Sequence, residues 1–97
     1  MPYAVEFEVP GDEHLYERVK DAIGAGRPDG LLVHMVVKTA RGLRHIEVWN
    51  TLDEHERFHR ERVEPAVHAV LRSIGITETP PRHVHDQLTL IDLQVTS

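Results

Sequence analysis

The 97-residue chain contains no cysteine, and only 5% of its residues are aromatic. The lack of cysteine excludes a disulfide framework, a thiolate nucleophile and a thiolate metal site. No apolar run approaches the roughly 20 residues that a membrane-spanning helix needs. The N-terminal residues lack the basic start and long apolar core of a signal peptide. These absences predict a cytoplasmic protein with no membrane partner.

Positive charge is also scarce, with 11 Lys and Arg against 16 Asp and Glu and a formal net charge of −5. The basic residues are scattered, and Arg57, Arg60 and Arg62 alternate with glutamates as on a solvent-facing helix. Because no basic stripe with interleaved aromatic residues appears, we expect no nucleic-acid partner. The length allows a single domain over residues 1–97, and so small a domain often gains stability by oligomerising.

The hydrophobic pattern predicts four strands and two helices. The strands are expected at residues 3–9, 31–38, 43–49 and 88–95. Asp12 can cap a first helix, and Thr51 with Glu54 forms a capping box for a second helix that ends near Ile74. Pro65 lies inside the second helix, so we expect a kink or two helical pieces there. The order βαββαβ predicts an α+β, ferredoxin-like fold, with a four-stranded antiparallel sheet and both helices on one face.

A hairpin between the second and third strands divides their side chains between two faces of the sheet. Pairing Lys38 with Leu43 creates one strongly apolar face, which we expect the helices to cover. That face carries Leu31, Val33, Met35, Val37, Ile46 and Val48. The opposite face carries Leu32 beside Trp49, His34 beside Glu47, and Val36 beside His45. It is too apolar to remain in water, so a twofold partner sheet is the simplest cover and predicts a homodimer.

The junction between the third strand and the second helix resembles a known family. Residues 46–51, Ile-Glu-Val-Trp-Asn-Thr, run directly into an acidic helix start that reaches Phe58. With the element order, this junction is similar to the antibiotic-biosynthesis-monooxygenase-like branch of the dimeric α+β barrel superfamily. The resemblance implies a homodimer whose two sheets close a barrel, with pockets for small organic molecules. Members of the superfamily include cofactor-free oxygenases of aromatic polyketides, haem-degrading enzymes and isomerases.

The first candidate site is the cluster of His34, Glu47 and Trp49. A histidine beside a carboxylate in a partly desolvated pocket has a tuned pKa and can accept a proton. We therefore predict His34 as a general base, Glu47 as its orienting partner and Trp49 as a flat wall for an aromatic substrate. His45 and Phe58 complete the predicted substrate-binding set. The alternative is an inward polar pair that only fixes strand register or the dimer interface.

A second candidate is the segment 55–59, His-Glu-Arg-Phe-His, which matches the zinc-protease pattern H-E-x-x-H. Two histidines four residues apart share a helix face and could hold one zinc ion. However, Arg62 and Pro65 occupy the positions where a third ligand would follow, and Glu78 lies beyond the helix-ending Gly75. We therefore predict no metal site, and expect the two histidines to pack against the sheet edge, with adventitious cation binding as the alternative.

The third candidate is His68, because haem-degrading members of the resembled superfamily carry an axial histidine on the second helix. Phe58 stands near the position of their helix tryptophan, and the first strand has glutamates in place of their asparagine. His68 is expected to face solvent unless a break at Pro65 turns it. His83 and His85 are expected at a polar edge before the last strand.

Three functions therefore stay open. The leading one is a homodimeric small-molecule-binding domain, resembling a cofactor-independent monooxygenase that acts on aromatic or polyketide-like substrates. The second is a non-catalytic ligand-binding or accessory domain that uses the same pocket. The third is haem binding or degradation through His68. The first two need no cofactor.

Overall fold

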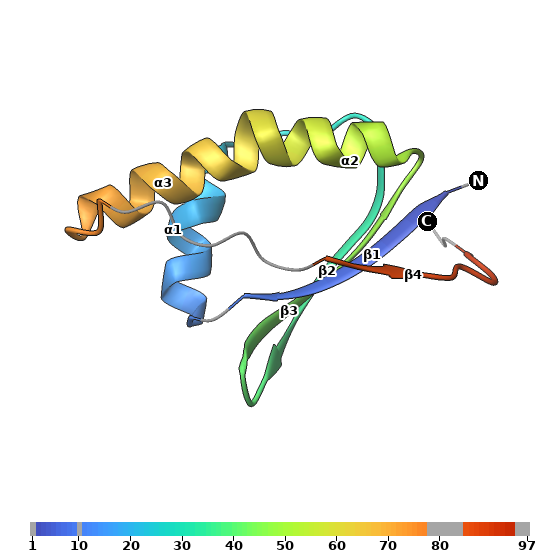
Figure 1. The fold of residues 1–97 in the computed structure, drawn as a ribbon, viewed down its shortest axis with the longest axis horizontal. Helices are drawn as coiled ribbons and strands as arrows, with labels where there is room; N and C mark the ends of the chain where they lie inside the picture. Colours follow the sequence, from blue (N-terminus) through green and yellow to red (C-terminus); the bar gives the residue numbers. More distant parts are fainter. Residues whose placement is uncertain (1, 10, 78–84, 95–97) are drawn as a thin grey trace.

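The computed structural model describes residues 2–9, 11–77 and 85–94. In chain order the elements are β1 (Tyr3–Val9), α1 (Glu13–Ile23), β2 (Leu31–Thr39), β3 (Gly42–Trp49), α2 (Leu52–Phe58), a π-helical turn (His59–Val63), α3 (Glu64–Ser73) and β4 (Asp86–Leu88). The strands form one antiparallel sheet of order β2-β3-β1-β4. The helices lie together on one side of that sheet (Figure 1). The predicted α+β ferredoxin-like arrangement is confirmed.

The β2–β3 hairpin has the predicted register, with Lys38 opposite Leu43 and His34 opposite Glu47. One part of the prediction is wrong, because Trp49 lies opposite Leu31 and not beside Leu32. An irregularity between Leu31 and Val33 leaves Leu32 outside the regular pairing. Such a bulge adds one residue to one strand and shifts the pairs that follow it.

The prediction of which sheet face the helices cover is also wrong. The covered face is the one with His34 and Glu47, whereas Met35 and Val37 on the opposite face are 47% and 37% exposed. The reason lies in β1, which the hairpin pattern did not include. Every second residue of β1 places a large side chain on this face. These residues pair with Trp49, Glu47, His45 and Leu43 of β3, and in the same order they are Tyr3, Val5, Phe7 and Val9. Of these eight residues, Val5 and Trp49 are fully buried, and the contribution of β1 makes this face the more apolar one across the whole sheet.

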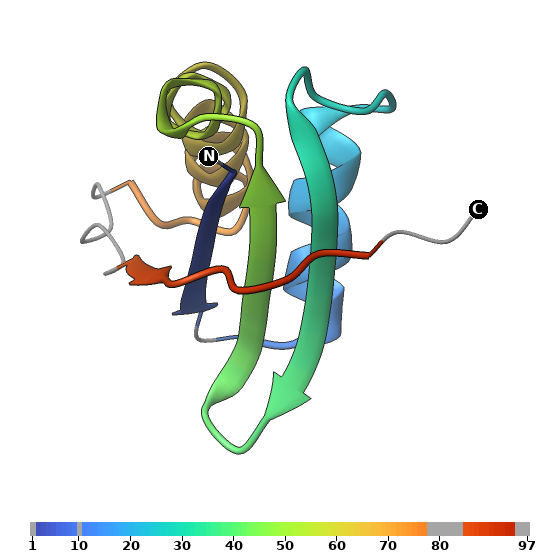
Figure 2. The same cartoon turned by 90° about the vertical axis from the view of Figure 1, so that its right-hand side faces the viewer.

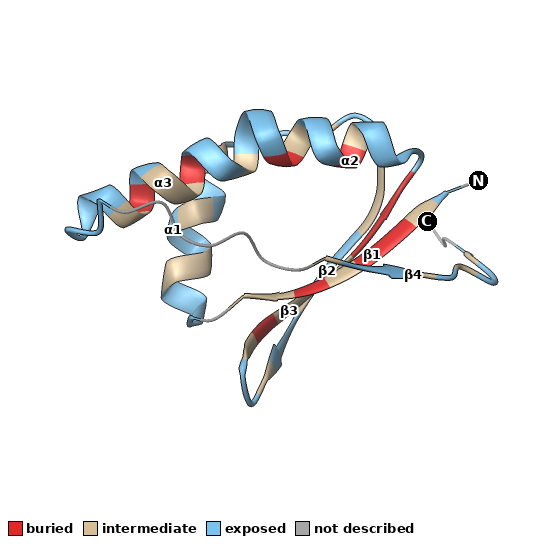
Figure 3. Cartoon of the chain, in the orientation of Figure 1, coloured by how far each residue is buried: buried red, intermediate tan, exposed pale blue. Residues whose placement is uncertain are grey.

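The core lies between this face and the helices, as the buried segments in Figure 3 show. Val5 and Trp49 are fully buried in the sheet, and Ala66 and Val70 of α3 are 6% exposed. No helix in the described ranges is long and apolar enough to cross a membrane.

The predicted break in the second helix is confirmed, and it takes the form of a π-helical turn. The backbone N–H of Glu64 donates to the carbonyl of His59, five residues earlier. Pro65 follows directly and has no N–H to continue an α-helical ladder. The wider turn therefore absorbs the missing donor, and it changes the direction in which later side chains point.

The predicted helix caps are present. Asp12 Oδ1 accepts from the N–H of Leu15 at 3.0 Å. Thr51 Oγ1 accepts from the N–H of Glu54 at 3.2 Å and donates to the Glu54 carboxylate at 3.0 Å. The capping box is thus closed between the two side chains, and not by the reciprocal backbone bond that the sequence suggested.

The last strand is shorter than predicted, since β4 covers Asp86–Leu88 and not residues 88–95. Leu88 lies opposite Ala4, the second residue of β1, so an extension of β4 beyond Leu88 would have almost no partner in that strand. Residues 89–94 leave the sheet edge and cross in front of the other strands, on the side away from the helices (Figure 2). Residues 95–97 lie outside the described part of the chain.

Gly30 provides a test of how the β3–α2 junction packs. It has a φ of +84°, its carbonyl accepts from the N–H of Asn50 at 2.8 Å, and an added Cβ would collide with the carboxylate of Glu54. We expect Gly30→Ala to lower the free energy of unfolding by about 2 kcal/mol, because it adds backbone strain and displaces a capping side chain. Urea denaturation followed by circular dichroism measures this.

Gly26→Ala is the matched control, since Gly26 also has a positive φ, of +114°, but nothing lies within 4 Å of an added Cβ. We expect it to cost about half as much, from backbone strain alone. An equal decrease in the free energy of unfolding for the two variants would contradict the close packing of Glu54 on Gly30.

Candidate functional site

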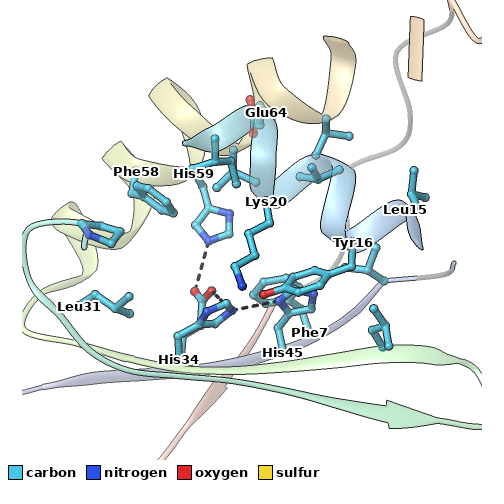
Figure 4. A pocket seen from close by; sticks show the side chains of 18 of the residues that line it. Phe7, Leu15, Tyr16, Lys20, Leu31, His34, His45, Phe58, His59 and Glu64 are labelled. Carbon is cyan, nitrogen blue, oxygen red and sulfur yellow. Dashed lines mark hydrogen bonds and ion pairs between the residues drawn. The ribbon is translucent and has the colours of Figure 1, made fainter. Parts of the chain in front are cut away.

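A cavity of about 640 Å³ lies between the sheet and the helices. Its floor is the helix-facing side of β1, β2 and β3, and its walls come from α1 and from the helical segment that runs through the π turn into α3. Apolar side chains such as Leu15, Val19 and Leu71 line much of it. Polar side chains gather over the floor, where His34 and His45 rise from the strands and His59 reaches down from the helix (Figure 4).

The structure brings the predicted trio together. Glu47 is 5% exposed, and its Oε2 lies 3.6 Å from Nε2 of His34. The indole N–H of Trp49 donates to the other oxygen, Oε1, at 3.1 Å. About a third of the His34 side chain is exposed (33%), so this imidazole can meet a ligand while its carboxylate partner stays buried. Trp49 borders the cavity but is itself fully buried.

Two further histidines approach the same carboxylate, and the sequence prediction did not assign them to the site. His59 Nε2 lies 3.3 Å and His55 Nδ1 lies 3.5 Å from Glu47 Oε1. Both imidazoles are buried beneath the helix, with side chains 11% and 4% exposed. Their H-E-x-x-H spacing did predict a shared helix face. The sequence analysis did not connect them with Glu47, because it placed Glu47 on the sheet face away from the helices.

The histidines extend into a wider network. His34 Nε2 lies 3.4 Å from His45 Nδ1, and His55 Nε2 lies 3.3 Å from His85 Nδ1. Phe7 stacks on the rings of both His45 and His85, with centroid distances of 4.7 and 4.1 Å. The ring stacking and the contacts between ring nitrogens fix the orientation of the imidazoles. The sequence had placed His85 at a polar edge, whereas it lines the cavity; His83 lies outside the described residues.

Glu47 is charged in the folded protein. Burial by itself would raise the pKa of this carboxyl group. The interactions with His55, His59 and Trp49 act in the opposite direction and outweigh burial, so the pKa of Glu47 lies well below its usual range. The contact from His55 is long and leaves its Nδ1 without a hydrogen bond, so we attribute the lowering mainly to His59 and Trp49. The site therefore holds a fixed negative charge under a low-dielectric cover.

The remaining predicted residues also reach the cavity. Phe58 borders it and packs against Trp49, with ring centroids 5.6 Å apart. His68 lines the cavity in a half-buried position, although a straight helix would have pointed it to solvent; the π turn accounts for this change. Lys20 of α1, which the sequence analysis did not select, points into the cavity toward His34 and His45 (Figure 4).

The buried charge predicts a pH-dependent stability. Because the pKa of Glu47 is lower in the folded than in the unfolded chain, ionised Glu47 stabilises the fold above the unfolded value of about 4.5, and this contribution is lost as the pH falls through the folded pKa. At pH 7 we expect Glu47→Gln to lower the free energy of unfolding by about 1–3 kcal/mol. The difference in the free energy of unfolding between this variant and the unsubstituted protein should become progressively smaller below pH 4.5.

Denaturant titrations at pH 7, 5, 4 and 3, in the presence of a chelator, measure this difference. Glu61→Gln is the control, since Glu61 is exposed and should change stability by less than about 0.5 kcal/mol at every pH. A Glu47→Gln deficit that stays constant from pH 7 to pH 3 would contradict a lowered pKa.

Comparison with known proteins agrees with this architecture. No family model matches the chain, and no curated protein matches it either. Among solved structures, SnoaB, a cofactor-independent oxygenase from Streptomyces nogalater, superposes with a TM-score of 0.55 at 17% identity, over 95% of this chain and 93% of that one. The monooxygenase ActVA-Orf6 of Streptomyces coelicolor, solved with nanaomycin D, superposes with a TM-score of 0.51 at 18% identity, over 97% of this chain and 91% of that one. Rv0793 from Mycobacterium tuberculosis superposes with a TM-score of 0.53 at 18% identity, over 96% of this chain and 98% of that one. The chain therefore has the fold of the antibiotic-biosynthesis-monooxygenase-type dimeric α+β barrel proteins.

Proposed function

We propose that the cavity binds a small polycyclic phenol-like molecule, and that His34 removes a proton from it so that it reacts with molecular oxygen without a cofactor. The observation that carries this proposal is the pair formed by a partly exposed imidazole and a buried, ionised carboxylate on the cavity floor. The fold is shared with a protein described as a cofactor-independent oxygenase, which supports the same reaction class.

The reaction needs a base, and it needs the negative charge that forms on the substrate to be stabilised. His34 takes a proton from an activated C–H group through Nδ1, the ring nitrogen opposite the one that faces Glu47, and the resulting carbanion is delocalised over the aromatic rings. Electron transfer from the carbanion to oxygen and recombination give a hydroperoxide, which loses water to leave a ketone. One CH₂ group and one O₂ are thus converted into one C=O group and one H₂O. No protein group is oxidised or reduced.

Each neighbouring residue has a part in this scheme. Glu47 Oε2, 3.6 Å from the imidazole, stabilises the positive charge that His34 acquires when it accepts the proton. Lys20 points toward the same end of the cavity, where its ammonium group can face the charge that develops on the substrate. Phe58 and the apolar side chains of α1 and α3 provide the contact area for flat rings.

We also propose that the protein acts as a homodimer through the helix-free face of the sheet. Met35 and Val37 are 47% and 37% exposed on that face, and Ile91, in the segment that crosses it, is 89% exposed. Exposed apolar side chains on one face are typical of an interaction surface. A second copy offers a complementary apolar face by symmetry. A cytoplasmic location remains a prediction from the sequence.

Two other functions use the same cavity. A non-catalytic domain would bind the aromatic ligand without consuming oxygen. Haem binding is favoured by the position of His68 on the cavity wall, but β1 has glutamates in place of the asparagine of haem-degrading members of the resembled superfamily. A shifted Soret band on mixing with haem that is lost in His68→Ala would support haem binding.

The proton-transfer step is tested with His34→Ala. We expect oxygen uptake with anthrone and with naphthohydroquinones to fall by about 10²–10⁴-fold, which is the usual contribution of a positioned general base. Measurements use an oxygen electrode and chelator-treated protein. His14→Ala is the matched control, since His14 is exposed on α1 and should leave the rate unchanged. Equal turnover by the His34→Ala variant would remove the proposed base, and binding without any uptake would favour the non-catalytic function.

The dimer is tested with Met35→Glu. Placing a carboxylate in the proposed apolar interface should raise the dimer dissociation constant by at least about 100-fold, since an unpaired charge would be buried. Sedimentation equilibrium over a range of protein concentrations measures this. Arg41→Glu, in the exposed hairpin turn, introduces the same side chain away from the face and should not change assembly. A monomer at all concentrations for the unsubstituted protein would refute the proposal.

A further inference from the structure

We propose that Glu47, His55 and His59 form a binding site for one divalent first-row transition-metal ion, with zinc as its simplest occupant. The site would have two imidazole nitrogens and one carboxylate oxygen as ligands. It shares the Glu47 carboxylate with the oxygenation proposed above, which uses His34 and the other carboxylate oxygen.

The first support is the spacing of the donor atoms. The distances from Glu47 Oε1 to His59 Nε2 and His55 Nδ1 are 3.3 and 3.5 Å. Ligands about 2.0–2.2 Å from a tetrahedral zinc ion lie about 3.3–3.5 Å from one another. One atom from each of the three residues lies within 4.8 Å of the others, and all three residues are buried. Two of the three separations are thus already those of ligands around a shared cation, and the third lies within 4.8 Å.

The second support is an orphaned atom. His55 Nδ1 is buried and has no hydrogen-bond partner, although it faces the Glu47 carboxylate. If His55 Nε2 carries the proton and donates to His85, Nδ1 presents a lone pair to a negatively charged oxygen. Such an arrangement is unfavourable in a low-dielectric interior without a cation between the two groups. A metal ion satisfies both atoms at once.

The surroundings match the outer shell of a metal site. A metal-bound imidazole commonly donates its other N–H to a polar neighbour, and His55 Nε2 lies 3.3 Å from His85 Nδ1. The carboxylate ligand is itself oriented by the indole N–H of Trp49 at 3.1 Å. His59 borders the cavity, so an ion bound there could keep its fourth position open toward it. Two histidines and one glutamate are a known set for zinc sites with an open position.

The proposed site uses both histidines of the H-E-x-x-H match, but it differs from a zinc-protease site in its third ligand. The two histidines lie four residues apart across the end of α2, and the third ligand comes from β3, which precedes the motif. In the zinc-protease pattern the third ligand instead follows the two histidines. Glu56, which would be the general base of a zinc protease, is exposed, and nothing in the arrangement resembles peptide hydrolysis.

A neighbouring set, His34, His45 and Glu47, also has donor atoms within 4.8 Å of one another. Two observations favour the first set. His34 is exposed, whereas His55 and His59 are both buried. Lys20 also points toward the side of His34 and His45, and its ammonium group disfavours a second cation there (Figure 4).

The experiment is zinc titration by calorimetry into tag-free protein that has been stripped with a chelator and then desalted. We expect one zinc ion per chain with a dissociation constant below about 1 µM. Affinity should fall by at least about 100-fold in Glu47→Gln and in His59→Ala, since each removes a ligand. His14→Ala should bind as the unsubstituted protein does, and His34→Ala should retain the site. Far-UV circular dichroism checks that each variant is folded.

If a ligand variant does not fold, imidazole resonances of the unsubstituted protein locate the ion directly. Zinc should shift the ring signals of His55 and His59 and leave that of His14 in place. Absence of a site tighter than about 10 µM would overturn the inference, and so would unchanged binding in Glu47→Gln or shifts confined to His34 and His45. Because oxygen uptake is measured in chelator, failure of one proposal leaves the other to be judged by its own assay.

Discussion

The organisation of the helix-facing side depends on one buried carboxylate. Glu47 is 5% exposed, and an ionised carboxylate removed from water is stable only when hydrogen-bond donors or positive charges surround it. Trp49, His59 and His34 approach it from three directions, and their elements are positioned so that these contacts form. The sheet face, the start of α2 and the orientation of the imidazoles are therefore linked through a single side chain.

The two oxygens of Glu47 face different environments. Oε1 meets Trp49, His55 and His59 under the helix, where the side chains are buried. Oε2 meets His34, which is partly open to the cavity. One carboxylate can thus be held rigidly on its inner side while its outer side serves a group that contacts a ligand. Through its two oxygens, one side chain thus connects the proposed cation site under the helix with the proposed base on the cavity floor.

Much of the fold followed from the sequence because it depends on local signals. The period-two strands, the caps at Asp12 and Thr51, the break near Pro65 and the hairpin register each arise from residues close together in the chain. The covered face did not follow, because it was judged from two strands while the apolar side chains of β1 decide it. The predicted length of β4 was wrong for a similar reason, since its pairing with β1 stops near the first residues of β1.

For the site, His34, Glu47 and Trp49 were predicted as a group because strand pairing and parity bring them together. Their neighbours are His55 and His59 of the helical segment and His85, which directly precedes β4. No local pattern states which sheet residue lies below a helix. Lys20 was missed in the same way. Contacts between layers depend on the packing of whole elements, which a single sequence does not encode in any short window.

The π turn has a consequence for how this cavity can diverge among related chains. Such a turn is equivalent to an α-helix with one inserted residue, and one residue in a helix corresponds to a rotation of about 100°. A relative with a single deletion between positions 59 and 63 would keep His55 over the sheet while rotating α3, so that the place now taken by His68 would pass to another side chain. A one-codon change in length could therefore exchange a whole wall of the cavity without touching its floor.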